Sequence, residues 1–335
     1  MSNLTLTIAC WGYDKVKPFL TGEVKIQGVD INLKKIWVQE IFRRMLGNKE
    51  FDASEMSFSA YINTLFTKDK PFIGIPVFLS RKFRLGYVFI NRESSIRSPE
   101  DLKGKRVGIP EFRHTASVWI RGILEEKYGV PVESVTYVLG PMEREKSLNK
   151  YYIYVPQLDS TELYRNDIKI VRAPEGKVLS EMLAEKEIDA LYHAQIPTTY
   201  YTTDKVKRLF DNYIEEDLKY FKEEGIFPIM HLLVIRRDIY EKNKWIAKAL
   251  YDAFLKAKEI AYEELRVTGV NTYMHPWLEY EMEKITKLMG QDYWPYGVKA
   301  NRKTIEKFIY YMYKQGLIPD KLGVEEIFAP ETLDT

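Results

Sequence analysis

Cysteine is nearly absent from this chain. Its 335 residues include a single cysteine, Cys10, which excludes a disulfide within the chain and any zinc site built from several thiolates. Long apolar runs are also missing, since none approaches the roughly 18 residues that a membrane-spanning helix requires. The first ten residues lack a basic start, a long apolar stretch and a small-residue cleavage site, so we expect a cytoplasmic protein.

An excess of charge of either sign is missing as well. Fifty Lys and Arg residues oppose 48 Asp and Glu residues, for a net charge of +2, so we expect neither nucleic acid nor membrane as a partner. A single core stops growing at roughly 250–300 residues, so a chain of this length predicts two lobes. Abundant Lys, Glu, Ile and Tyr with little cysteine is a composition typical of thermophilic proteins.

The hydrophobic pattern alternates between the periods of strands and helices. This alternation favours an α/β fold with mostly parallel sheets. The predicted strands are 4–10, 31–38, 51–56, 72–79, 86–91, 106–109, 135–139, 153–155, 168–172, 188–192 and 230–235. The predicted helices are 40–48, 59–67, 115–128, 177–185, 213–224, 244–265, 276–289 and 301–315.

Several segments carry a family resemblance. Residues 96–110 resemble the first crossover into the second lobe of type II solute-binding proteins. They read Ile-Arg-Ser-Pro-Glu-Asp-Leu-Lys-Gly-Lys-Arg-Val-Gly-Ile-Pro, and residues 189–191 fit the same pattern. Longer segments resemble the 4,5-dihydroxyphthalate decarboxylase family along essentially the whole chain. These segments are 51–57, 108–111, 115–122, 225–231, 294–297 and 328–333.

The resemblance implies a two-lobed type II periplasmic-binding-protein-like fold, in which each lobe is a mixed, mostly parallel sheet flanked by helices. Lobe one is expected to hold 1–88 and 228–335, and lobe two 89–227. Hinges are expected near 86–92 and 222–230, with the ligand cleft between the lobes. The polar, tyrosine-rich stretch 141–165 departs from the family pattern.

Two residues are candidates for acid–base chemistry. His231 stands at the start of a predicted strand near the second crossover, and histidine titrates near neutrality. The alternative role is that of a hydrogen-bonded hinge residue. Glu111 is the candidate second acid or base, provided that burial raises its pKa.

Candidates for binding the ligand share positions at strand ends, loops or helix starts. A helix start with free backbone N–H groups suits a carboxylate, arginine binds carboxylates through two parallel hydrogen bonds, and aromatic rings stack on an aromatic acid. Helix capping, solvated surface and ordinary core packing are the competing explanations. The residues are Trp11, Tyr13, Ser57, Ser59, Arg81, Arg84, Arg113, His114, Thr115, Ser117, Tyr192 and His193, with Phe83 and Trp119 as further members of an aromatic wall.

The resemblance implies decarboxylation of an aromatic dicarboxylate, 4,5-dihydroxyphthalate, to 3,4-dihydroxybenzoate by a carboxy-lyase without an organic cofactor. A divalent metal on Glu111, His114 and His193 is an alternative that no ligand spacing supports. Two other functions stay open: a non-catalytic binding protein for a small carboxylate-bearing ligand, and an enzyme of the same fold with another substrate. Tyr and Trp in the C-terminal helices either form a homo-oligomer contact or pack against lobe one.

Overall fold

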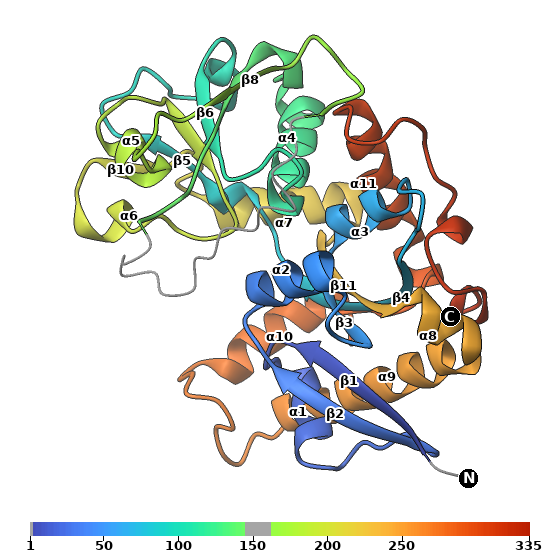
Figure 1. The fold of residues 1–335 in the computed structure, drawn as a ribbon. Helices are drawn as coiled ribbons and strands as arrows, with labels where there is room; N and C mark the ends of the chain where they lie inside the picture. Colours follow the sequence, from blue (N-terminus) through green and yellow to red (C-terminus); the bar gives the residue numbers. More distant parts are fainter. Residues whose placement is uncertain (1–2, 145–161) are drawn as a thin grey trace.

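Two β-sheets form two lobes in the computed structural model, which describes residues 3–144 and 162–335 (Figure 1). The first sheet has the order β2-β1-β3-β11-β4, and the second has the order β10-β5-β9-β6-β7-β8. The strands of the first sheet are β1 (Leu4–Cys10), β2 (Val29–Lys35), β3 (Ala53–Ser57), β4 (Phe72–Arg81) and β11 (Ile229–Arg236). Those of the second are β5 (Val88–Asn91), β6 (Arg106–Ile109), β7 (Thr136–Leu139), β8 (Lys169–Arg172), β9 (Ala190–Tyr192) and β10 (Val206–Arg208).

Helices cover both sheets. They are α1 (Lys17–Leu20), α2 (Val38–Asn48), α3 (Phe58–Thr64), α4 (Thr115–Tyr128), α5 (Leu179–Ala184), α6 (Thr199–Thr202), α7 (Tyr213–Glu224), α8 (Arg237–Lys242), α9 (Trp245–Leu265), α10 (Leu278–Met289) and α11 (Arg302–Lys314). No helix in the described ranges is both long and apolar enough to cross a membrane.

Both sheets are mixed, which confirms the predicted fold class. The pairs β1–β2, β1–β3, β9–β6, β6–β7 and β7–β8 are parallel. The pairs β3–β11, β11–β4, β10–β5 and β5–β9 are antiparallel. The antiparallel pairs cluster where the chain passes from one sheet to the other.

The chain crosses between the lobes twice. Residues 82–87 lead from β4 to β5, and residues 225–228 lead from α7 back to β11, so the first crossover precedes most of the expected hinge at 86–92. The two crossovers lie side by side, because the Lys82 amide donates to the Pro228 carbonyl at 3.1 Å and the rings of Phe83 and Phe227 stack with centroids 4.6 Å apart.

Most predicted elements are present, with differences at the ends. The predicted strand 31–38 is wrong at its end, since β2 stops at Lys35 and Val38 already begins α2. The sequence Ile36-Trp37-Val38 reads as strand because its residues are β-branched or aromatic, but in the fold Trp37 precedes the helix. The three-residue strand β10 was not predicted, and the predicted strand 153–155 falls outside the described residues.

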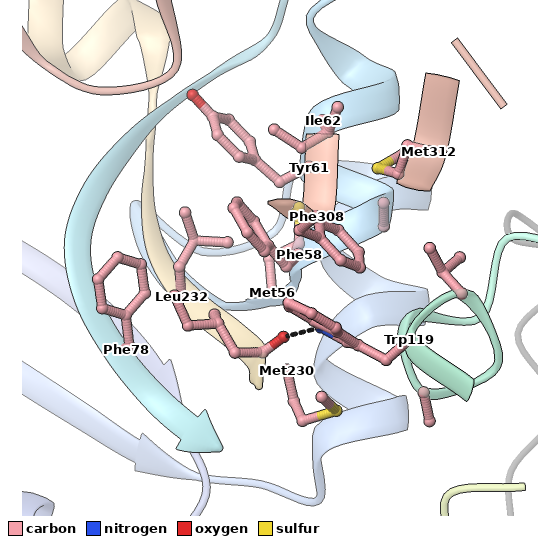
Figure 2. Close-up of a cluster of buried hydrophobic side chains, with 14 of the residues drawn as sticks. Met56, Phe58, Tyr61, Ile62, Phe78, Trp119, Met230, Leu232, Phe308 and Met312 are labelled. Carbon is pink, nitrogen blue, oxygen red and sulfur yellow. Dashed lines mark hydrogen bonds between the residues drawn. The ribbon is translucent and has the colours of Figure 1, made fainter. Parts of the chain in front are cut away.

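A hydrophobic core joins the lobes (Figure 2). Trp119, on α4 of lobe two, is fully buried and stacks on Phe308 of α11 in lobe one, with ring centroids 5.2 Å apart. Its indole Nε1 donates to the carbonyl of Ile229 at 2.9 Å. The expectation of Trp119 in an aromatic ligand wall is therefore wrong, because its ring belongs to this core.

The helix that carries Trp119 is buried around its whole first half. Every residue from Thr115 to Leu124 is buried, as expected for a helix enclosed between two lobes. Gly122 lets α11 approach, because a Cβ at this position would lie 2.3 Å from the ring of Tyr311. Gln315 of lobe one donates to the Val118 carbonyl at 2.9 Å, and Gly129 ends the helix with φ of 59°.

Replacing Trp119 with Ala removes the side chain that connects the two lobes. We expect the free energy of unfolding, measured with urea, to fall by roughly 3–5 kcal/mol. Trp119→Phe is the matched control. It keeps most of the stacking on Phe308 but leaves the Ile229 carbonyl without its donor, so it should lose only about 1–3 kcal/mol. Equal losses in both variants would contradict the role assigned to the ring.

Candidate active site

A cavity of about 260 Å³ lies between the lobes, next to the first crossover. Aromatic side chains of lobe one form one wall, namely Trp11, Tyr13, Trp37 and Phe42. Trp11 and Trp37 meet edge to face with centroids 5.0 Å apart. The other lining residues are Val38, Gln39, Ser57, Ser80, Lys82, Arg84, Glu111, His114, Thr115, Ala116, His193, Ala194, Gln195, Met230 and His231. The apolar wall and few polar groups are typical of a site for a small ring-bearing ligand.

His231 enters the cavity from β11. The strand register places it opposite Ser57 of β3 and beside Ser80 of β4. The pairing of β11 with β4 shifts on both sides of His231, an irregularity of the kind that re-aims side chains next to active sites. The side chain of His231 is 17% exposed. The rings of His231 and Phe42 meet edge to face, with centroids 5.0 Å apart.

A buried carboxylate, Glu55, lies behind His231. Its Oε1 is 2.6 Å from His231 Nδ1 and accepts from the Tyr13 hydroxyl at 2.6 Å, while Oε2 accepts from the Trp11 amide at 3.0 Å. An ionised carboxylate only accepts hydrogen bonds, so Nδ1 carries a proton in this pair and Nε2 is the nitrogen available to a ligand. Burial, and then the nearby Glu55 charge, raises the pKa of Tyr13 well above its usual value.

Glu55 was not among the predicted site residues, although two signals in the sequence point to it. It is a charged residue inside a short strand that is otherwise apolar or small, and it stands two positions before Ser57. Because side chains two apart share a face of a strand, Glu55 and Ser57 face the same side. The partner His231 is 176 residues away in the chain, so the pair itself becomes visible only in the fold.

Arg84 supplies a buried positive charge at the cavity. It lies on the first crossover, and its Nη1 donates to the Ala194 carbonyl at 3.2 Å while Nε is 3.1 Å from the sulfur of Met230. Burial lowers its pKa to about 10, so it remains charged near neutrality. Within the described ranges no carboxylate lies within ion-pairing distance of it. The charge of Asp217 raises the pKa of Arg84 from beyond ion-pairing distance, and a buried guanidinium with no carboxylate in direct contact is costly.

Hydroxyl groups join the lobes at the edge of the cavity. Thr115, the first residue of α4, has its Oγ1 2.8 Å from both Ser57 Oγ and Ser59 Oγ, and it accepts from the Ser59 amide at 3.1 Å. Ser59 also donates to the carbonyl of Arg113. Ser57 and Thr115 line the cavity, whereas Ser59 does not. The predicted anchors therefore bond to one another across the lobe boundary.

Two histidines of lobe two lie together in the cavity wall. The rings of His114 and His193 have centroids 5.6 Å apart. Burial lowers the pKa of His193 to about 3 and the pKa of His114 well below its usual value, and Arg84 adds to both shifts. Both are neutral near pH 7, so they suit hydrogen bonds to hydroxyl groups better than ion pairs. His114 Nδ1 is 3.1 Å from Ser117 Oγ.

The remaining predicted site residues do not line the cavity. Arg81 donates to the carbonyls of Phe227 and Pro295 at 2.9 and 2.7 Å, and Arg113 donates to the carbonyl of Glu162 at 3.1 Å. Ser117, Phe83 and Tyr192 also lie outside the lining, and the ring of Tyr192 is fully buried in the core. Glu111, His114 and His193 do line the cavity, but no group of three metal-binding side chains is formed by the residues that the structure describes.

The sequence analysis missed part of the lining. Trp37 was placed in the strand predicted over 31–38, Gln39 fell between two predicted elements, and Phe42 was placed in the predicted helix 40–48, so none of them was expected in the cavity. Ser80, Lys82, Gln195 and Met230 also line the cavity. Each of them adjoins a residue that had been considered, so proximity in sequence to Arg81, Arg84, His193 and His231 is the signal that could have found them.

Comparisons with known proteins give relatives along the whole chain, although no protein-family model matches. The 4,5-dihydroxyphthalate decarboxylase of Comamonas testosteroni is 34% identical over 336 residues, which cover 100% of this chain and 99% of that protein. The protein of the same name from Pseudomonas putida is 37% identical over 200 residues, which cover 60% of this chain and 74% of that one.

Two solved structures share the fold. The desulfurization enzyme DSZB superposes with a TM-score of 0.54 at 13% identity, covering 99% of this chain and 98% of that one. The periplasmic aliphatic sulphonate binding protein SsuA of Escherichia coli superposes with a TM-score of 0.53 at 12% identity, covering 98% of this chain and 92% of that one. At such low identity these structures establish the two-lobed binding-protein fold alone.

The buried histidines predict a dependence of stability on pH. The pKa of His193 falls from 6.5 in the unfolded chain to about 3 in the fold, so below pH 6.5 the unfolded state binds more protons and stability decreases. We expect a loss of about 2 kcal/mol from this residue between pH 7 and pH 5, measured by urea unfolding. His193→Gln should remove that part of the loss. His275→Gln, at an exposed position, is the control and should leave the pH dependence unchanged; an unchanged dependence in His193→Gln would refute the assignment.

Proposed function

Because the chain belongs to the 4,5-dihydroxyphthalate decarboxylase family, we propose that it removes carbon dioxide from 4,5-dihydroxyphthalate to give 3,4-dihydroxybenzoate. The observation that carries the proposal is the arrangement of charge in the cavity. Arg84, whose guanidinium has no carboxylate in direct contact among the described residues, and His231, whose imidazole is bonded to the Glu55 carboxylate, line the same small space beside an aromatic wall. Such a space offers an anchor, an acid–base group and a surface for stacking.

The substrate is a planar ring with two neighbouring carboxylates and two neighbouring hydroxyls. We assign the carboxylate that stays on the ring to Arg84, which can bind it through charge-assisted hydrogen bonds. The ring is assigned to the aromatic side chains of Trp37 and Phe42. The carbon that carries the departing carboxylate then faces His231. The neutral His114 and His193 suit the ring hydroxyls.

The reaction needs proton transfers and no redox step. Removal of the proton from the hydroxyl para to the departing carboxylate moves electron density to the carbon that bears this carboxylate. Protonation of that carbon gives a keto intermediate, and cleavage of the carbon–carboxylate bond releases carbon dioxide and restores the aromatic ring. We assign the carbon protonation to His231 and the hydroxyl proton to Glu111, which line the cavity from lobe one and lobe two. The proposal includes no organic cofactor, and it places the reaction in the cytoplasm.

A binding protein without catalysis is the second candidate, since SsuA of Escherichia coli has the same fold. The two candidates differ in one measurement, carbon dioxide release from 4,5-dihydroxyphthalate by the purified protein with and without EDTA. We expect release in both conditions. Release that requires added metal would contradict the cofactor-independent mechanism, and binding of the compound without release would favour the second candidate.

His231→Ala tests the acid–base role. If His231 protonates the ring carbon, its loss should lower kcat roughly 10²- to 10⁴-fold, while the dissociation constant of the substrate changes little. His275→Ala, at an exposed position, is the control and should keep full activity. Turnover of His231→Ala equal to that of the unaltered protein would remove this residue from the mechanism.

Arg84→Gln tests the carboxylate anchor. Hydrogen bonds to a charged group contribute about 1.5–3 kcal/mol, so KM should rise roughly 10- to 100-fold with a smaller change in kcat. Arg84→Lys keeps the charge but loses the planar guanidinium, so its KM should lie between those of the unaltered protein and Arg84→Gln. Lys82→Gln, which removes an exposed charge from the rim, should change KM by less than Arg84→Lys. Thermal unfolding of each variant separates loss of binding from loss of the bond to Ala194.

A further inference from the structure

We infer that Glu55 is the positioning residue of the reaction: it holds His231 as an imidazole protonated on Nδ1 and stabilises the imidazolium whose Nε2 delivers the proton to the ring carbon. This deepens the proposed function and rests on it. Glu55 does not line the cavity, so it acts through His231 and not on the substrate.

The geometry restrains His231 from several directions. Nδ1 lies 2.6 Å from Glu55 Oε1, and Phe42 contacts the ring edge at a centroid distance of 5.0 Å. The backbone of His231 is paired with strands on both sides, opposite Ser57 and Ser80. The ring therefore cannot exchange its two nitrogens without breaking the bond to Glu55, and Nε2 stays the nitrogen that meets the ligand.

Among the described residues, one group that can become cationic, His231, is in direct contact with Glu55. Its side chain is fully buried, and within the described residues no Lys or Arg nitrogen lies within 4.0 Å of it. Its other partners are neutral donors, the Trp11 amide and the Tyr13 hydroxyl. The His231 ring is therefore the described group in direct contact with Glu55 that can carry a positive charge.

The other titratable groups near the pair leave this balance unchanged near neutrality. Burial raises the pKa of Cys10 on β1 and of Tyr13 in the following loop, and it lowers the pKa of His114 at the start of α4, so all three are neutral. Lys15 also feels the charge of Glu55, but its ammonium is 3.3 Å from Asp14.

The proton balance of the step is closed. The imidazolium carries protons on both nitrogens, and the Nε2 proton passes to the ring carbon as a C–H bond forms. The carbon–carboxylate bond then breaks, carbon dioxide leaves, and the electron pair of that bond returns to the ring. His231 is left neutral with its proton on Nδ1, which donates to Glu55; solvent restores the Nε2 proton, and Glu111 returns the proton to the ring hydroxyl. Glu55 exchanges no proton.

Glu55→Gln tests the inference by kinetics and by spectroscopy. The amide keeps the shape but removes the charge, so kcat should fall roughly 10²- to 10⁴-fold, while KM changes only a few-fold. The pH–rate profile should differ from that of the unaltered protein, because the group bonded to Nδ1 changes from a carboxylate to a neutral amide. In nitrogen-detected NMR of the histidines, the proton on Nδ1 of His231 should be present in the unaltered protein and lost or exchanged between nitrogens in the variant.

Two further variants keep the test decisive. Glu55→Asp retains the charge on a shorter side chain, farther from His231 Nδ1. It should recover part of kcat, with a pH profile closer to that of the unaltered protein. Asp52→Asn removes a carboxylate that precedes the same strand and accepts from the Thr7 amide at 2.7 Å. Asp52 lies outside the cavity lining, so this control should not alter the pH profile.

Glu55→Gln with unchanged kcat and pH profile would overturn the inference, as would an unaltered protein in which Nδ1 of His231 carries no proton. A fall in kcat without a shift of the pH profile would also overturn it, because that pattern indicates only a structural role. If the unaltered protein releases no carbon dioxide, the proposed function fails, and the NMR comparison alone decides whether Glu55 sets the protonation of His231.

Discussion

The packing of Trp119 between the lobes is the contact on which the geometry of the cavity depends. Its ring, on α4 of lobe two, packs against Phe308 in the core of lobe one. Its indole nitrogen donates to the backbone of β11 two residues before His231. The same helix begins at Thr115, whose hydroxyl bonds to Ser57 and Ser59 across the boundary. The cavity thus lies against two elements that are bonded directly to each other, which keeps the walls at a set distance.

This packing also explains how charge is distributed around the ligand. The anionic group, Glu55, is buried behind His231 in the sheet of lobe one, whereas the cationic group, Arg84, reaches the cavity from the crossover. Charges separated in this way cannot neutralise each other by a direct ion pair. In the proposed function a dianionic substrate binds Arg84 while Glu55 stays available to the imidazole, so the two charges act on opposite parts of the ring.

The sequence predicted the elements better than it predicted the contacts between them. Helices 115–128 and 213–224 match α4 and α7 residue for residue, because their apolar period and their stops at Gly129 and Gly225 are local signals. His231, Arg84 and Thr115 were singled out by residue type and position near a crossover or helix start. Glu55 was not, since its role depends on the register between β3 and β11, which pairs residues 176 positions apart. Arg81 and Arg113 look the same as Arg84 in sequence, and only the fold sets them apart, because Arg84 lines the cavity and the other two do not.

The same two-lobed fold occurs in a sulphonate-binding protein and in a desulfurization enzyme, so the fold by itself does not separate binding from catalysis. In this chain the difference lies in a few side chains. An arginine that holds an anion is compatible with either function, and so is an aromatic wall. A histidine whose inner nitrogen is bonded to a fully buried carboxylate adds little to binding, since burying that carboxylate costs free energy. Proton transfer is the role we propose for such a group, and for this reason the proposed function rests on the His231–Glu55 pair more than on the arginine or the aromatic wall.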